Sequence, residues 1–453
     1  MPAGDTPGET GSRARLTSGS VTRHLAAMSV PMAWGILAVI SFNVADTYFV
    51  GQLGTGPLAA LSFTFPVVMT VMSLALGLGI GVASVLSRAI GARGEDEVRR
   101  LTTDSLVLAT LIVLAFVALG LATIDPLFAA LGADAATRVL IADYMTIWYL
   151  GMPFIVVPMV GNNAIRACGD ARLPSAIMTA AAVLNILLDP LFIFGWGPVP
   201  AMGIQGAAVA SLAARATTLV LALAILHYRM RLIAWRWPRP GHLWRSAREI
   251  LHVALPAAAT NMVNPIAVAV ITALVARFGP ASVAGFGVAT RIEAFALIPL
   301  LALTAGLGPV VGQNWGGGHV DRVARALRGA AVFCLGYGVL VAGLLALAAP
   351  SLAALFDDHP ETVGAATLYL WLVPVSFTGY GVLICVNAAL NAAGRPLAAT
   401  ALMALRTFVL YVPLAWLAAA WGSLGGVFAA ATAAGLVAGG LAWRRGLRLI
   451  ARG

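Results

Sequence analysis

Long apolar runs follow one another along the whole chain, separated by short polar stretches. Because the hydrocarbon core of a bilayer is roughly 30 Å thick, a helix that crosses it needs about 20 mostly apolar residues. Runs of that size lie at 25–51, 58–88, 102–124, 140–163, 173–196, 203–228, 248–277, 283–313, 326–349, 363–386, 396–420 and 423–444. The pattern predicts an all-α integral membrane protein with twelve transmembrane helices.

The composition agrees with this pattern. Of the 453 residues, 60% are hydrophobic and 10% are charged, whereas a soluble domain has roughly a quarter of its residues charged. The mean hydropathy is +0.92. The formal charge of +10 comes from arginines in short clusters between the apolar runs, so we expect no nucleic-acid partner. The three cysteines are scattered and the six histidines show no paired spacing, so no metal site is expected.

The arginines also predict the orientation of the chain. With the N-terminus placed inside the cell, the inner segments contain most of the 28 basic residues, including those from Arg229 to Arg248. The outer segments contain Arg138 and Arg277 beside several acidic residues. Because cytoplasmic loops are rich in arginine, we expect a multi-pass protein of the inner (plasma) membrane with both termini in the cytoplasm. Residues 1–24 have no apolar core before a cleavage site, which predicts a cytoplasmic tail rather than a signal peptide.

The sequence repeats itself at an offset of 225 residues. The offset places Pro31 on Pro256, Gly91 on Gly316, Asp96 on Asp321, Tyr144 on Tyr369 and Asn162 on Asn387. An even number of spans per repeat makes the two halves parallel, related by a pseudo-two-fold axis along the membrane normal. The expected parts are an N-terminal tail (1–24), an N-terminal lobe (25–228), a cytoplasmic linker (229–247), a C-terminal lobe (248–445) and a C-terminal tail (446–453).

Two carboxylates fall within the apolar runs of the first half. Asp46 lies in the first run and Asp189 in the fifth, each in the outer half of its helix. A charged side chain at the centre of a bilayer costs about 3 kcal/mol, so such residues are usually paired and functional. The alternatives are structural: Asp46 is interfacial, and Asp189, which precedes Pro190, caps a helix break. The offset places Ile271 and Leu414 opposite these acids, so ion coupling is expected in the N-terminal lobe alone.

Polar neighbours extend this candidate ion site. Asn185 and Asp189 are four residues apart and therefore share one helix face, which Met178 continues. Asn43 lies one turn before Asp46. Carboxylate and amide oxygens around a small cavity can bind a proton or a sodium ion, and Met178 and Asn43 are candidates for the substrate pocket.

The other charged residues within spans are more ambiguous. Glu293 and Arg291 are two residues apart and face different sides of one helix, so they do not simply pair. Glu293 either attracts a cationic substrate, as part of the pocket, or is neutralised by a residue of another helix. Arg215 and Arg406 are interpreted as packing or network residues.

Pro31 lies fifteen residues before Asp46 in the first span. A proline inside a helix frees a backbone carbonyl and creates a bend. This bend is a candidate gate that protonation of Asp46 would bias, with a purely structural kink as the alternative.

Several segments together resemble the multidrug and toxic compound extrusion (MATE) family. They are VADTYFVGQLG, NNAIRACGDARLPSA, LNILLDPLFIFG, GIQGAAVAS and GRPLAA, in that order along the chain. The resemblance implies two six-helix lobes in a V shape that exchange drugs or metabolites for protons or sodium ions.

Within the family the chain is most similar to the DinF-like branch. That likeness implies that Asp46 and Asp189 are the coupling carboxylates, with Asn185 and Asn162 in their hydrogen-bond network and Pro31 as the bend. Ser211 stands where the family often has a threonine that helps to bind a cation. Phe42 replaces a network tyrosine, and Asn264 replaces the acid of the NorM-like branch, which argues against a sodium site in the second half.

We therefore expect a monomeric secondary antiporter that exports small organic compounds, often cationic and amphipathic, by alternating access. Its partners are the bilayer and its small-molecule substrates, and it needs no cofactor beyond the coupling proton or sodium ion. A lipid or lipid-linked saccharide flippase of related fold is the alternative, although such a protein would require a wide, arginine-lined central cavity. An enzyme is not expected, because no nucleophile–base pair, metal set or GxxxxGK[ST] loop is visible.

Overall fold

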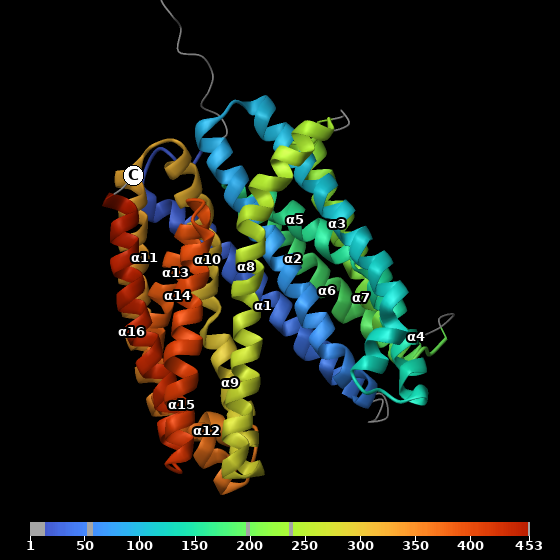
Figure 1. The fold of residues 1–453 in the computed structure, drawn as a ribbon, viewed down its shortest axis with the longest axis vertical. Helices are drawn as coiled ribbons and strands as arrows, with labels where there is room; N and C mark the ends of the chain where they lie inside the picture. The colour runs from blue at the N-terminus through green and yellow to red at the C-terminus, as the bar shows by residue number, and fades with distance from the viewer. Residues whose placement is uncertain (1–13, 52–57, 196–199, 235–238, 452–453) are drawn as a thin grey trace, which may run out of the picture.

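The computed structural model describes residues 14–51, 58–195, 200–234 and 239–451, and the regular elements in these ranges are helices (Figure 1). The helices of the first half are α1 (Val21–Gly51), α2 (Leu58–Ala92), α3 (Glu95–Ala130), α4 (Ala135–Gly151), α5 (Pro153–Ala167), α6 (Arg172–Phe194), α7 (Ile204–Ala224) and the π-helical turn η1 (Ile225–Arg229). Those of the second half are α8 (Pro240–Val275), η2 (Ala276–Phe278), α9 (Pro280–Ala296), α10 (Ile298–Gly316), α11 (Val320–Ala354), α12 (Pro360–Leu372), η3 (Val373–Ser376), α13 (Phe377–Ala392), α14 (Pro396–Ala404), the π-helical η4 (Leu405–Tyr411), α15 (Val412–Ala420) and α16 (Leu424–Ala451).

Several predicted spans are made of two consecutive helices. Within the described residues, 11 helical segments are long and apolar enough to cross a membrane. The pair α9 and α10, bent by 43°, adds a twelfth when it is counted as one span. Prolines at the starts of α5, α10 and η3 fit these breaks, because proline suits the first turn of a helix but not its interior. The all-α membrane architecture expected from the sequence is confirmed.

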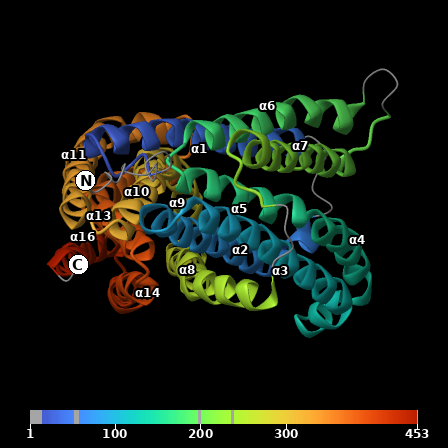
Figure 2. The same cartoon turned by 90° about the horizontal axis from the view of Figure 1, so that it is seen from above.

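The two halves form two lobes that lie side by side, with α3 to α7 on one side and α11 to α16 on the other (Figure 2). The first parts of α1 and α8 cross between the lobes. Met28 of α1 is buried in the same core as Leu307 of the second half, and Ile250 of α8 is buried with Val82 and Leu86 of the first half. Each lobe therefore includes one helix segment from the other half of the sequence.

The lobes meet at one end and separate at the other. We call the meeting end the arginine-rich end; it contains residues 93–94, 168–171, 230–234, 317–319 and 393–395, between successive helices. Towards the opposite end the helices of the two lobes diverge, so that the molecule has the outline of a V (Figure 1). By the arginine argument, the arginine-rich end is the one predicted to face the cytoplasm.

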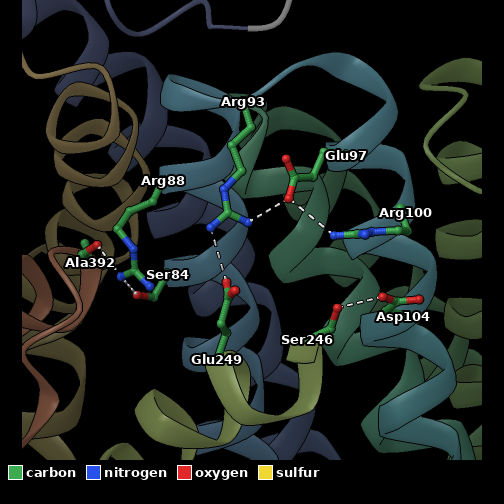
Figure 3. Close-up of polar contacts among 9 residues, drawn as sticks. All are labelled: Ser84, Arg88, Arg93, Glu97, Arg100, Asp104, Ser246, Glu249 and Ala392. Carbon is green, nitrogen blue, oxygen red and sulfur yellow. Dashed lines mark hydrogen bonds and ion pairs between the residues drawn. The ribbon is translucent and has the colours of Figure 1, made fainter. Parts of the chain in front are cut away.

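A buried acid ties α8 to the first lobe near the arginine-rich end. Asp104 of α3 is 1% exposed and accepts a hydrogen bond from Ser246 Oγ at 2.6 Å (Figure 3). Leaving a buried carboxylate without its donor costs about 1–3 kcal/mol. We expect Ser246→Ala to lower the thermal unfolding temperature in detergent.

The neighbouring Ser105 supplies a control for this prediction. It is also buried, but its hydroxyl donates to the Leu101 carbonyl of its own helix, so Ser105→Ala leaves no carboxylate unpaired. Equal melting temperatures for the two variants would show that the link between Asp104 and Ser246 does not stabilise the crossing of α8.

Candidate functional site

The two predicted coupling carboxylates lie on neighbouring helices of the N-terminal lobe. Asp46 is on α1 and half-buried, whereas Asp189 is on α6 and fully buried. The two helices pack along each other, and the carboxylates are close enough to repel each other electrostatically. The structure therefore brings together the pair that the sequence singled out.

Asp189 lies among acceptor oxygens that have no donor. Among the described residues, nothing donates a hydrogen bond to either carboxylate oxygen of Asp189 or to Oδ1 of Asn185. The amide of Asn185 faces Ser211 Oγ on α7 at 3.5 Å. Buried polar oxygens are rarely left without partners, and hard cations prefer carboxylate, amide and hydroxyl oxygens. A proton on Asp189, or a sodium ion among these three side chains, would satisfy them.

Asp46 has a charged partner that the sequence did not assign to it. Arg215 of α7 interacts electrostatically with Asp46 and with the hydroxyl of Tyr144 on α4. The interpretation of Arg215 as a network residue fits this position. The guanidinium offsets the charge of Asp46. Among the described residues, the charge that acts on Asp189 is the repulsive one of Asp46, so Asp189 is the less compensated of the two acids.

Three further predicted residues lie on α5, α6 and α1. Asn162, on α5, has a buried Oδ1 to which none of the described residues donates, and it makes no hydrogen bond with the carboxylate of Asp189. Met178 packs towards Gly35 of α1. Asn43 is exposed on α1. The functional roles assigned to Asn162, Met178 and Asn43 stay predictions.

The C-terminal lobe has an acidic cluster of its own, around Glu293 of α9. The carboxylate accepts a hydrogen bond from the Tyr369 hydroxyl at 2.5 Å and interacts electrostatically with Arg406. The Arg406 guanidinium lies over the ring of Tyr380, 4.4 Å from its centroid, and 5.8 Å from that of Tyr411. Of the two interpretations left open for Glu293, this geometry favours neutralisation within the lobe.

Pro31 and Pro256, which are equivalent in the repeat, each accept a hydrogen bond from a neighbouring helix. Its carbonyl accepts a hydrogen bond from Ser175 Oγ of α6 at 2.5 Å, and the carbonyl of Pro256 in α8 accepts one from Thr400 Oγ1 of α14 at 2.9 Å. Both pairs obey the offset of 225 residues. These bonds tether a proline-containing turn to the neighbouring helix, which is the position a hinge requires.

Reciprocal bonds close the arginine-rich end. Arg88 of α2 donates to the carbonyl of Ala392 in the C-terminal lobe at 2.9 Å and to Ser84 at 2.7 Å (Figure 3). The repeat mate of Arg88, Gln313 of α10, donates to the carbonyl of Ala167 in the N-terminal lobe at 2.7 Å. Each lobe therefore binds the last carbonyl of a helix in the other, and separating the lobes at this end breaks both bonds.

Two glycines permit the close approach behind these bonds. A Cβ atom added to Gly91 would lie 2.0 Å from the carbonyl oxygen of Gln313, and one added to Gly316 would lie 2.2 Å from that of Arg88. Since real Cβ atoms do not come within 3.0 Å of another heavy atom, any larger residue would force α2 and α10 apart.

The segment before α1 closes the same end from outside. Residues 14–20 lie against the C-terminal lobe, where the backbone of Leu16 bonds to the side chains of Gln313, Asn314 and Arg322 at 3.0–3.2 Å. Arg322 also donates to the carbonyl of Gly19 at 2.8 Å. The part of the predicted tail that the structure describes thus bridges the two lobes; residues 1–13 lie outside the described residues.

Sequence reasoning missed Tyr144, Tyr369, Arg88 and Gln313. A signal was present for the tyrosines, since the repeat pairs Tyr144 with Tyr369 and each lies beside a membrane acid. The cross-lobe bonds of Arg88 and Gln313 depend on how the lobes dock, which the hydrophobic pattern does not specify.

Comparison with known proteins agrees with this architecture. The MatE family model matches residues 31–191 and again 256–417, the two halves of the repeat. The chain is 40% identical to an FAD transporter of Shewanella oneidensis over 88% of each chain. It is 27% identical to the probable multidrug resistance protein YpnP of Bacillus subtilis, covering 89% of this chain and 90% of that protein.

Solved structures show the same two-lobe fold. The Vibrio cholerae MATE transporter VcmN in a bent form superposes with a TM-score of 0.89 at 30% identity, over 97% of this chain and 98% of that one. A multidrug resistance MATE transporter in an outward-facing conformation superposes with a TM-score of 0.90 at 28% identity, over 98% and 99% of the two chains. The predictions of a twelve-helix, two-lobe transporter and of a protein that is not an enzyme are confirmed. The chain belongs to the MATE family of multi-pass membrane transporters.

Proposed function

We propose that this transporter is a secondary antiporter that exports small organic compounds in exchange for protons or sodium ions bound at Asp189 and Asp46. The observation that carries the proposal is the burial of Asp189 beside Asn185 without a hydrogen-bond donor among the described residues. An uncompensated carboxylate in a membrane protein has an unfavourable free energy of burial and is usually functional. Binding of a cation neutralises the charge and removes this unfavourable term. The contact of the lobes at one end and their separation at the other supports alternating access.

The cargo is a small organic compound of either of two classes. The family resemblance favours amphipathic and often cationic compounds, and relatives such as YpnP are named as multidrug proteins. The 40% identity with a protein named as an FAD transporter favours a flavin dinucleotide as the second candidate class. A lipid headgroup, the cargo of a flippase, stays the alternative. We further propose that the protein works as a monomer in the plasma membrane, with both termini in the cytoplasm and without a cofactor or a nucleic-acid partner.

Transport into proteoliposomes tests this function. Vesicles containing the protein receive ethidium or FAD, and either a pH gradient or a sodium gradient is imposed. We expect one of the two gradients to drive cargo uphill and its dissipation to stop the flux, because exchange takes its energy from the ion. Cargo flux that is the same with and without both gradients would contradict antiport. Export by an Asp46→Asn variant at the wild-type rate would show that the coupling assignment is wrong.

A further inference from the structure

A cavity of about 210 Å³ lies between the lobes, just above the bonds that close the arginine-rich end. Its walls come from α2 and α5 of the first half and α10 and α13 of the second. The offset of 225 residues pairs Ile80 with Ala305, Ser84 with Pro309, Asn163 with Ala388 and Arg166 with Asn391 across it. The cavity therefore lies on the pseudo-two-fold axis. It would form the floor of a central cleft between the two lobes.

The charge in this cavity comes from one lobe. Arg166 brings a guanidinium into the lining, and no aspartate or glutamate is among the described lining residues. Across the axis the repeat mates of Ser84, Asn163 and Arg166 are a proline, an alanine and an asparagine. The two walls are thus alike in backbone and different in chemistry, with the positive charge on the N-terminal side.

Arg166 has no acidic partner among the described ion pairs of the chain. Its Nη2 donates to Oδ1 of Asn163, whose own amide donates to the Met159 carbonyl at 2.8 Å. Two acids near the arginine-rich end, Glu97 and Glu249, instead bind Arg93 on the surface of the N-terminal lobe (Figure 3). A partly buried charge without a counter-charge is unfavourable, so an anion in the cavity would be stabilised.

A second guanidinium adds to the positive field. Arg88 lies one helical turn beyond Ser84 and donates to its hydroxyl at 2.7 Å, while Ser84 in turn donates to the carbonyl of Asn391. Apart from Ser84, Asn163, Arg166, Asn391 and Thr304, the described lining residues, such as Ile80 and Ala305, are apolar. An aromatic or aliphatic body with one anionic group matches this lining, whereas a cation would face Arg166 without any carboxylate to balance it.

We propose that Arg166 binds an anionic group, a phosphate or a carboxylate, of the transported cargo in this interlobe cavity. The inference rests on the proposed export function and narrows its substrate class to organic anions. Ligand pockets usually enclose roughly 300–1,000 Å³, so this cavity holds the anionic end of a molecule whose remainder extends into the cleft. Cargo and coupling ion then have separate sites, one between the lobes and one in the N-terminal lobe, and exchange operates through the conformation of the lobes rather than by competition for one carboxylate.

Equilibrium binding to the purified protein tests this inference without any gradient. FAD and riboflavin share one ring system, but only FAD contains phosphate. We expect wild-type protein to bind FAD more tightly than riboflavin, and Arg166→Gln to weaken FAD binding by about tenfold or more with riboflavin binding unchanged, because a charge-assisted hydrogen bond is lost. Arg166→Lys should retain part of the preference for FAD.

The control is Arg172→Gln, which removes a charge from the exposed start of α6 at the same end of the molecule. It should bind both flavins like the wild type. In a parallel experiment the protein is placed in vesicles that contain a fluorescent anionic phospholipid. If the lipid moves across the bilayer only when Arg166 is present, and FAD does not bind, the same anion site is supported with a lipid phosphate as its ligand. The inference is overturned if wild type shows neither the FAD preference nor this lipid movement, or if Arg166→Gln weakens both flavins equally or neither. Gradient-driven export of ethidium that is unaffected by Arg166→Gln would leave the antiport proposal intact in that case.

Discussion

Replacing Asp189 with asparagine is expected to reduce gradient-driven export to about a tenth of the wild-type rate or less, since a tenfold effect requires the loss of only about 1.4 kcal/mol of ion binding. Asparagine keeps the size of the side chain but cannot ionise, so it can neither hold a proton for exchange nor bind sodium as a carboxylate. The buried position of Asp189, with neither carboxylate oxygen bonded to a described donor, makes this the most sensitive position of the candidate site. The measurement is the initial rate of cargo uptake under an imposed ion gradient, together with cargo affinity in detergent.

The variant should keep its cargo affinity while it loses gradient-driven export. Asp143→Asn is the matched control, because Asp143 is an exposed acid on α4, next to Tyr144. It should export like the wild type. If Asp189→Asn exports at the wild-type rate, or if Asp143→Asn is equally impaired, Asp189 is not the coupling group.

Gly91→Ala should keep the arginine-rich end from closing. The new Cβ would meet the backbone oxygen of Gln313 at 2.0 Å, and a backbone atom cannot rotate away as a flexible side chain can. Alanine normally stabilises a helix relative to glycine by up to about 1 kcal/mol, so a loss of transport would not come from a weaker helix. We expect export to fall by about tenfold or more, since closure at this end is opposed by more than 1.4 kcal/mol.

Spin labels at Asp96 and Asp321 report this opening directly. The two positions are exposed, belong to different lobes and are repeat mates at the arginine-rich end. Their separation should increase in Gly91→Ala, and likewise in Gly316→Ala. Gly94→Ala is the control, because no atom lies within 4 Å of a Cβ at that position. Unchanged label distances in both Gly91→Ala and Gly316→Ala would contradict the role of this contact as a gate.

The sequence predicted the number and kind of the membrane spans because hydrophobic length is a local property. It also predicted which positions are equivalent, and the structure follows that equivalence in detail: Ser175 bonds Pro31 as Thr400 bonds Pro256. That Asp46 and Asp189 belong together could be inferred from their shared depth in two spans of one half, the first and the fifth.

Other features depend on which helix faces pack against each other. The sequence of an apolar helix contains little information about which of its faces does so. The approach of Arg215 to Asp46 and of Arg406 to Glu293 joins helices far apart in sequence. The crossing of α1 and α8 between lobes was hidden for the same reason, since an all-apolar helix packs equally well against many partners. The unpaired charge of Arg166 could be noticed only once the cavity around it was seen.

Exchange of cargo for a cation held by the acids of the N-terminal lobe can be measured by counting ions. Cargo is added to the purified protein in weakly buffered detergent solution, and released protons are measured with a pH-sensitive dye; released sodium is measured in parallel with a tracer. We expect the wild type to release protons or sodium ions in proportion to the cargo bound, and Asp189→Asn to bind cargo with little or no release. Ion release by Asp189→Asn that equals the wild type, or cargo binding by the wild type with no release of either ion, would contradict this exchange.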